Sequence, residues 1–474
     1  MFQYISNYTP TLRQSFIEAI QLRSYSVDSN SNSKISKAAK LAATPILKKT
    51  GKKPLSAIVL LTISALILIT FRDYQQTLTL DHNDPIRPTS WPLFLYSYLP
   101  LNAMSRLWGS FNSLDLPKPL RAPCYRFYSF LFNVNIDEMK NPDLSNYPNL
   151  GKFFYREIDM KHRPIDSTAL LVSPADGKVL KFGKVDKDGN IEQVKGMTYH
   201  LETFLGSTDS KKIANSNIIA PSKNSESIKD QESHSTFLNH LLNNTNLDCS
   251  SHAQDFAAPN EERTLVEFTD EGERSLFHPT TAQVIKASIA LNNKDLINKE
   301  ETDLFYAVIY LAPGDYHRFH SPVTWVSTLR RHFVGQLYSV APYFQHTFNN
   351  LFVLNERVAL LGYWKFGFFS MTPVGATNVG SIKLNFDEDL VTNTKIHNGV
   401  KSKKNTCYEA HYTNASPLLK GQPLFKGQEM GGFMLGSTVV LIFEAPKSFN
   451  FTLTQNQHVK VGERIGELKT NESK

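Results

Sequence analysis

The chain has 474 residues, of which 41% are hydrophobic, and a formal net charge of +7. This length provides for two or three domains and a sizeable core. The excess of Lys and Arg lies before position 54, and the remainder is balanced in charge, so the composition excludes a nucleic-acid-binding body.

Residues 1–53 are rich in serine, poor in acidic residues and punctuated by Lys and Arg. Leu12, Phe16, Ile17 and Ile20 fall near one face of a helix. This composition is typical of a mitochondrial transit peptide, and it predicts a targeting and matrix segment. The alternative is a disordered cytosolic tail.

Residues 54–71 form an uncharged and largely apolar stretch. Its length just spans a hydrocarbon core, which predicts a single transmembrane helix rather than a buried core helix. Lys52 and Lys53 precede it, while Arg72 and Asp73 follow and cancel. By the positive-inside rule, the N-terminus stays in the matrix and everything after Arg72 faces the intermembrane space.

Residues 72–152 form a membrane-proximal region rich in aromatic side chains and proline. Aromatic amphipathic helices of this kind lie at the headgroup level of a membrane, although a helical cap on the core is the alternative. The aromatic residues on which this prediction rests are Trp91, Phe94, Tyr96, Tyr98, Trp108 and Phe111.

Residues 153–474 contain short apolar runs between turn signals, at 170–172, 179–180, 307–311, 358–362 and 439–443. This spacing predicts an α+β fold whose catalytic domain is mainly antiparallel β-sheet, preceded by N-terminal helices. Residues 459–466 are expected to form a hairpin and closing strand. Residues 208–263 are too polar to bury a core and are predicted to be a disordered insert.

Cys124, Cys249 and Cys407 are scattered and form no CxxC pair. They support neither a disulfide framework nor a zinc site, and we expect no metal.

The candidate chemical residues lie in three segments. Gly436 and Ser437 precede the apolar run at 439–443, so a hydroxyl stands next to a carbonyl that lacks a neighbouring Cβ. Asp176 occupies a turn after an apolar strand, and His317 and His320 lie between proline-containing turns. A serine nucleophile needs a base and a group that orients the base, and these residue types supply both.

Five motifs connect these residues: SPADG (173–177), YLAPGDYHRFHSP (310–322), NERV (355–358), VGATNVGSI (374–382) and LGST (435–438). RPID (163–166) and VKGMTYHLETFLG (194–206) add two more. In this order they resemble the phosphatidylserine decarboxylases, in particular the fungal inner-membrane form. The resemblance covers residues 154–468, except for the polar insert.

The resemblance implies that Asp176, His320 and Ser437 form a self-cleavage triad. Ser437 would cut the bond after Gly436 and become a pyruvoyl group, the covalent cofactor that forms a Schiff base with the lipid amine. The small chain would be 437–474 and stay associated with the large chain. His317 matches the proton donor of the decarboxylation.

The glycine-rich segment at 375–380 is a further candidate. Backbone N–H groups in such turns often bind phosphate, so Gly375, Thr377, Asn378 and Gly380 are expected to contact the lipid phosphate. A plain strand turn is the alternative.

Two other functions use part of this pattern. A serine hydrolase would employ Asp176, His320 and Ser437, but it normally carries GxSxG on a strand-to-helix turn. A membrane-anchored carrier module would explain the transmembrane helix and the KxGExIG-like turns at 426–433 and 459–466, but not DYHRFH (315–320). The expected partner is phosphatidylserine in a membrane and not nucleic acid, and the sequence leaves open whether the chain forms a homo-oligomer.

Overall fold

The computed structural model describes residues 96, 99–186, 188–194, 197–206, 213–218, 231–243, 301–345, 348, 350–377, 381–394, 396–397, 400–401, 406–416, 418–434 and 437–469. The predicted targeting segment 1–53 and the predicted transmembrane helix 54–71 lie outside these residues. Within the described ranges, no helix is both long and apolar enough to cross a membrane.

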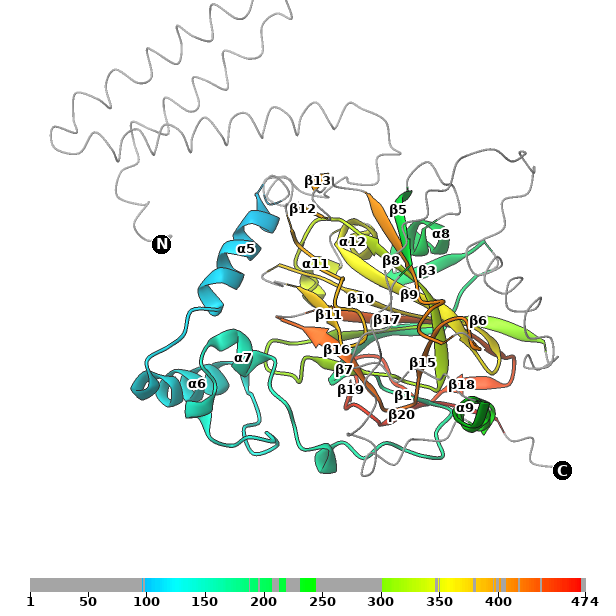
Figure 1. The fold of residues 1–474 in the computed structure, drawn as a ribbon, viewed down its shortest axis with the longest axis horizontal. Helices are drawn as coiled ribbons and strands as arrows, with labels where there is room; N and C mark the ends of the chain where they lie inside the picture. Colours follow the sequence, from blue (N-terminus) through cyan, green and yellow to red (C-terminus); the bar gives the residue numbers. More distant parts are fainter. Residues whose placement is uncertain are drawn as a thin grey trace, which may run out of the picture. The chain divides into compact units, whose positions relative to one another are not determined.

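A ten-stranded sheet forms the centre of the β-rich body (Figure 1). Its strands are β2 Gly177–Lys184, β5 Ile213–Ile218, β6 Thr302–Leu311, β8 Trp325–Phe333, β9 Arg357–Trp364, β10 Gly367–Val374, β14 Cys407–His411, β15 Gln422–Leu424, β17 Ser437–Pro446 and β19 His458–Val459. The order is β19-β2-β6-β17-β10-β9-β8-β14-β5, with β15 paired to β8. Only the β14–β5 pair is parallel, so the expectation of a mainly antiparallel sheet is confirmed for these residues.

Smaller sheets flank it. They comprise β1 Leu171–Val172, β20 Arg464–Leu468 and β18 Phe449–Phe451; β11 Ile382–Leu384, β16 Glu429–Phe433 and β7 Arg318–His320; β3 Asn190–Val194 and β4 Met197–His200; and β12 Ile396–His397 and β13 Val400–Lys401. The predicted hairpin at 459–466 is wrong. β19 pairs with β2, whereas β20 pairs with β1 and β18, because the turn at Gly462 carries the chain from one sheet to another.

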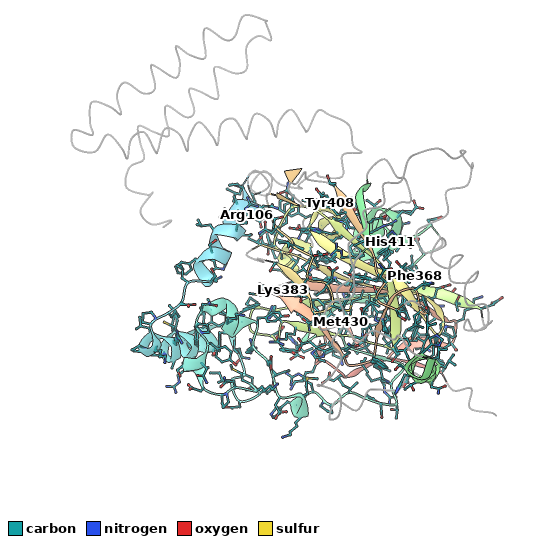
Figure 2. All side chains as sticks on the ribbon, in the orientation of Figure 1. Arg106, Phe368, Lys383, Tyr408, His411 and Met430 are labelled. Carbon is teal, nitrogen blue, oxygen red and sulfur yellow. The ribbon has the colours of Figure 1, made fainter. Side chains whose placement is uncertain are left out.

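The central strands explain why the apolar runs could be recognised. β9, β10 and β17 consist of buried residues along their whole length. Both edges of β17 are paired, with β6 and β10, and the burial of every residue along it shows that both of its faces are covered as well. A continuous apolar run, rather than an alternating one, is what such a strand requires. The side chains of these strands crowd the interior of the body, where Phe368 of β10 is labelled (Figure 2).

The longer helices of the described ranges are α5, α6 and α9, and the others have at most five residues. Their bounds are α5 Leu101–Asn112, α6 Lys118–Phe132, η2 Leu144–Asn146, α7 Leu150–Phe154, η3 Met160–His162, α8 Leu201–Leu205, α9 Gln231–Asn243, α11 Pro342–Gln345 and α12 Leu351–Leu354.

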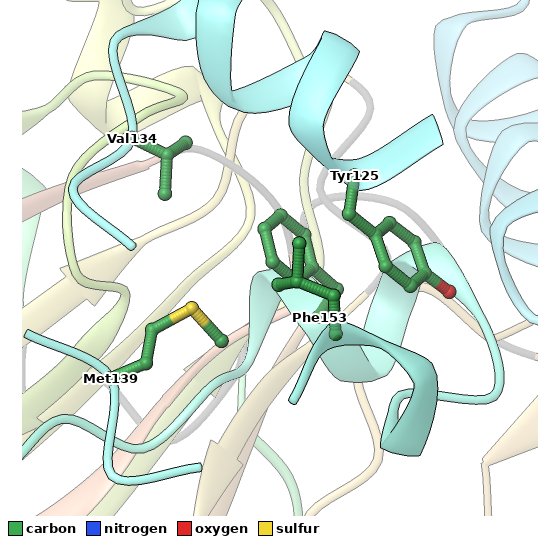
Figure 3. Packing of buried hydrophobic residues seen from close by; sticks show 5 residues of the cluster. Tyr125, Val134, Met139 and Phe153 are labelled. Carbon is green, nitrogen blue, oxygen red and sulfur yellow. The ribbon is translucent and has the colours of Figure 1, made fainter. Parts of the chain in front are cut away.

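Helix α6 is held to the body by one face. Tyr125 stacks on Phe153 of α7 with ring centroids 4.6 Å apart. Val134, Met139 and Leu144 complete this buried cluster (Figure 3). α6 ends at Phe132, and the left-handed backbone of the following residue, Asn133 (φ 54°), turns the chain out of the helix. The aromatic region is therefore helical here, as predicted.

Two stretches of the predicted disordered insert are ordered, so that prediction is wrong for them. β5 adds a parallel strand beside β14, and α9 buries Phe237 and Leu241. These two side chains are four residues apart, which places them on one helical face, and the Phe237 ring meets Phe425 at 5.0 Å. A polar segment needs only such a narrow apolar face to dock. The other residues of 208–263 lie outside the described ranges.

Candidate active site

Three neighbouring strands bring the three predicted segments to one edge of the main sheet. Asp176 immediately precedes β2, and β6 ends at Leu311, just before the segment with the two histidines. In the strand register, Lys178 and Thr438 both lie opposite Tyr310, and Ser437 lies opposite Leu311. The pairing order β2-β6-β17 therefore gathers residues that are up to 261 positions apart.

A second pairing ties the histidine segment to the chain that leads into Ser437. β7 runs antiparallel to β16, and the Phe433 N–H donates to the His317 carbonyl at 2.9 Å. A Cβ on Gly432 would lie 2.6 Å from that same carbonyl oxygen, so only glycine permits this approach. The backbone of His317 is thus bonded to Phe433, which precedes Ser437 by four residues in the sequence.

Ser437 is completely buried at the start of β17. Its Oγ has no hydrogen-bond partner among the described residues. Most buried hydroxyls in proteins are hydrogen-bonded, so an unpaired one calls for an explanation. Leu435 and the predicted cleavage-site residue Gly436 lie outside the described residues.

His317 is a buried, neutral imidazole with one unused nitrogen. Nδ1 lies 2.8 Å from the Asp315 carbonyl, which can only accept, so Nδ1 carries the hydrogen. Nε2 therefore bears the lone pair, and no described residue bonds to it. Burial lowers the pKa of His317 to about 3, and the ring packs 4.0 Å from Phe154.

His320 is buried as well, but both of its ring nitrogens are engaged. Nδ1 lies 2.9 Å from the Gly427 carbonyl and must donate to it. Nε2 then accepts from the Tyr316 hydroxyl at 3.1 Å. Burial lowers the pKa of His320, while the carboxylate of Glu429 acts to raise it.

Asp176 is bound to an arginine rather than to a histidine. Arg163 Nε contacts both carboxylate oxygens at 3.0 Å, and its Nη2 lies 2.6 Å from Oδ2. The Val461 N–H donates to Oδ1 at 2.8 Å. The expected hydrogen bond between Asp176 and His320 is not made here, because His320 Nδ1 donates to the Gly427 carbonyl and its Nε2 accepts from the Tyr316 hydroxyl. The two residues are nonetheless close, since the His320 N–H donates to the Pro174 carbonyl at 2.7 Å.

The predicted phosphate segment offers few donors in its described part. The Gly375 N–H already donates to the Glu356 carbonyl at 2.8 Å, and the Thr377 hydroxyl to the Leu337 carbonyl at 2.6 Å. Asn378 and Gly380 lie outside the described residues.

Three residues that contact this site were missed from the sequence. Arg163 holds Asp176, Tyr316 holds His320, and Arg156 donates to the carbonyls of Gly314 and Asp315. Arg163 lies in the RPID motif and Tyr316 in the YLAPGDYHRFHSP motif. The motifs therefore pointed to both residues, but they did not indicate which side chains the two residues would bind.

Comparison with known proteins agrees with the motif order. The sequence model of the family described as phosphatidylserine decarboxylase matches residues 150–241 and 257–467. The chain belongs to the phosphatidylserine decarboxylase family. The resemblance noted from the motifs is therefore confirmed, and the matched ranges include all four of the predicted triad and histidine positions.

Individual relatives are named accordingly. The chain is 50% identical over 395 residues to phosphatidylserine decarboxylase proenzyme 1, mitochondrial, of Saccharomyces cerevisiae, covering 81% of this chain and 76% of that protein. It is 41% identical over 384 residues to the proenzyme 1 of Schizosaccharomyces pombe (80% and 83% covered). It is 37% identical over 384 residues to the proenzyme of Rattus norvegicus (81% and 76%).

Proposed function

We propose that this decarboxylase converts phosphatidylserine to phosphatidylethanolamine and CO2, using a pyruvoyl group made from its own Ser437. The observation that carries the proposal is the buried, unpartnered Ser437 Oγ at the sheet edge where the histidine segment begins. In the uncut chain, a hydroxyl enclosed in this way stands next to its own preceding peptide bond, which supports attack on that bond as its first reaction.

In the self-cleavage, the Ser437 Oγ–H loses its proton to His320 and the oxygen attacks the Gly436 carbonyl. The Gly436–Ser437 amide becomes an ester, and loss of the Ser437 α-proton expels the Gly436 carboxylate. The dehydroalanine left behind adds water and releases ammonia, which leaves the pyruvoyl group at position 437. Asp176 would orient His320 and stabilise its charged form.

This base role requires a local change. His320 Nε2 must leave the Tyr316 hydroxyl, or pass its proton through it, before it can serve Ser437. Asp176 would in turn orient the imidazole only after His320 Nδ1 leaves the Gly427 carbonyl, to which it donates at 2.9 Å.

When present, the pyruvoyl group supplies an electron sink for the loss of CO2 from a bound amine. The chain's contribution is to move protons, and the unpartnered Nε2 of His317 supports its assignment to this task. Its Nε2 lone pair can take a proton from the lipid ammonium and return it to the carbon that loses CO2. The anionic substrate would raise the pKa of His317 from its low value, because a nearby negative charge favours the imidazolium.

The two chains would stay together after cleavage. β17 is the first element of the small chain, and ten of its residues pair with β6 of the large chain. β10 covers its other edge, and β20 pairs with β1. These ladders and the buried side chains of β17 are non-covalent contacts that cutting the backbone before Ser437 does not remove.

We further propose that the catalytic domain faces the intermembrane space, anchored in the inner membrane by residues 54–71 with the N-terminus in the matrix. Relatives are named mitochondrial, which supports the compartment. The exposed apolar surface of α5 and α6 supports membrane contact, since patches of this kind mark interaction sites. Its exposed side chains are Met104, Leu107, Trp108, Phe111, Leu120, Phe127, Phe130, Leu131 and Phe132.

A serine hydrolase is the competing function. Its nucleophile stands exposed on a turn between a strand and a helix. Ser437 instead begins strand β17, so it does not stand on the strand-to-helix turn that such a hydrolase uses.

Intact-mass analysis of purified protein separates these functions. The decarboxylase should yield two chains, and the small chain should begin with a pyruvoyl group and lack an α-amino group. Ser437→Ala should remain one inactive chain. A wild-type protein that remains uncut, or a small chain that begins with an ordinary serine, would contradict the proposal.

A further inference from the structure

The turn of residues 460–463 lies downstream of the cut site and is closed on itself. The Glu463 N–H donates to the Lys460 carbonyl at 3.1 Å, and the Lys460 N–H donates to the Glu463 carboxylate at 3.0 Å. Gly462 has a left-handed backbone (φ 84°), and a Cβ there would lie 2.8 Å from the Pro164 carbonyl oxygen. Glycine allows both this backbone and this close approach, so the turn is fixed in shape and in place.

The turn binds the residues that lead to Asp176. The Gly462 N–H donates to the Ser173 carbonyl at 3.0 Å, and the Ser173 N–H donates to the Glu463 carbonyl at 2.8 Å. The N–H of Val461, the residue before Gly462, donates to Asp176 Oδ1 at 2.8 Å. Hydrogen bonds to a charged group are stronger than those between neutral groups. The turn therefore holds both the backbone before Asp176 and one oxygen of its carboxylate.

The same turn reaches the surroundings of His320. The segment that it binds continues to Pro174, whose carbonyl accepts from the His320 N–H at 2.7 Å. The side chain of Val461 belongs to one buried cluster with Ile158 and Tyr316. The Tyr316 hydroxyl in turn donates to His320 Nε2 at 3.1 Å. Val461 thus binds the acid through its N–H and shares a cluster with the residue that binds the base.

We propose that this turn positions Asp176 for the self-cleavage, with Val461 as the positioning residue; the inference rests on the self-cleavage proposed above. Arg163 also binds the Asp176 carboxylate, but through a side chain whose rotatable bonds let it follow a displaced partner. The Val461 N–H belongs to an anchored backbone and cannot follow, so it fixes where the carboxylate lies. Residues downstream of the cut therefore hold the acid that supports the cut.

Gly462→Ala displaces the turn and tests the proposal directly. The added Cβ pushes the turn away from Pro164, and the Val461 N–H moves with it. Gly189→Ala is the matched control, because Gly189 also has a left-handed backbone (φ 78°) but precedes β3, and its Cβ would meet the His200 side chain. The full-length variants are synthesised in a cell-free system with detergent, and loss of the uncut precursor is followed over time on denaturing gels.

We expect Gly462→Ala to be cut roughly 10- to 100-fold more slowly than wild type, because a small displacement of a catalytic group has effects of this size. Gly189→Ala should be cut at the wild-type rate. Urea unfolding of both variants in the Ser437→Ala background shows whether they lose similar stability and remain folded. Equal cleavage rates for the two variants would overturn the proposal. A wild-type chain that is never cut would instead contradict the self-cleavage itself.

Backbone esters remove single N–H groups, and they decide the question if Gly462→Ala does not fold. An α-hydroxy acid at position 461 deletes the bond to Asp176, and one at position 462 deletes the bond to Ser173. A turn that only stabilised the fold would be equally sensitive to both losses. Positioning of Asp176 predicts a different result for each ester.

The ester at position 461 should slow the loss of precursor about tenfold, the lower end for a hydrogen bond to a charged group, because Arg163 remains bound to Asp176. The ester at position 462 should be cut close to the wild-type rate, although both esters should lose similar stability. Equal slowing by the two esters, or no slowing by the ester at position 461, would overturn the proposal.

Discussion

Replacing Arg163 by methionine would remove the guanidinium that joins two shielded carboxylates. Arg163 Nη2 lies 2.6 Å from both Asp176 Oδ2 and Glu138 Oε2, and the Arg163 side chain is 4% exposed. Methionine keeps much of the aliphatic volume, so the change is chiefly one of charge and hydrogen bonding.

The cost can be bounded from the contacts that remain. Removing one partner of a buried ion pair typically costs about 3–5 kcal/mol, because a charge is left without compensation. Here Asp176 retains the Val461 N–H at 2.8 Å, and Glu138 retains Lys460 at 3.4 Å. We therefore expect the lower end of that range, about 3 kcal/mol.

The assay is urea unfolding in a Ser437→Ala background, so that all proteins are single uncut chains. Asp176→Asn is the matched partner: the double variant Arg163→Met/Asp176→Asn should lose less stability than the sum of the single changes, because the unpaired carboxylate is gone. A single-variant cost below about 1 kcal/mol, or full additivity, would refute the reasoning. With Ser437 restored, Arg163→Met should also slow self-cleavage, because Asp176 loses its fixed orientation.

On denaturing gels, His320→Ala should accumulate the uncut precursor, whereas His317→Ala should be cut. His317→Ala should release CO2 from phosphatidylserine ~10²–10⁴-fold more slowly than wild type. If His317→Ala remains uncut and His320→Ala is cut normally, the two roles are reversed. The pKa of His317 is lowered from 6.5 to about 3, so the unfolded chain binds its proton more readily between these values. The contribution of His317 to stability is therefore complete above pH 6.5 and is lost as the pH falls toward about 3. In the Ser437→Ala background, the free energy of unfolding of His317→Gln should fall less steeply on acidification than that of the protein with His317, by up to ~1.4 kcal/mol per pH unit. Equal slopes for the two proteins would contradict this. Phe127→Asp with Phe130→Asp should weaken binding of the domain without residues 1–98 to liposomes while leaving its cleavage intact; undiminished binding would exclude α6 as the membrane contact.

The sequence by itself determined where the main strands lie and which chemical groups are present. The runs at 358–362 and 439–443 could be recognised because burial on both faces of a strand demands apolar side chains throughout, and this demand is written in residue types. The order of the five motifs likewise identified the family, because motifs are recognised from residue types along the chain and require no knowledge of the fold.

Short, polar or non-local features were beyond such reasoning. Residues 459–466 have the pattern of a hairpin, but which sheet each strand joins depends on partners hundreds of residues away. Helix α9 buries Phe237 and Leu241, and so narrow an apolar face does not stand out in a polar segment.

Only the tertiary structure decided the state of the site. The register of β2, β6 and β17 brings Asp176 and Ser437 to one edge of the main sheet. This register pairs segments far apart in the sequence, so it cannot be read from the spacing of nearby residues. Within the site, Asp176 is paired with Arg163, and His320 with the Tyr316 hydroxyl and the Gly427 carbonyl. A buried polar group cannot remain unpaired without cost, so packing, rather than residue identity, selects these partners and leaves Ser437, His317 and Arg156 with unused atoms.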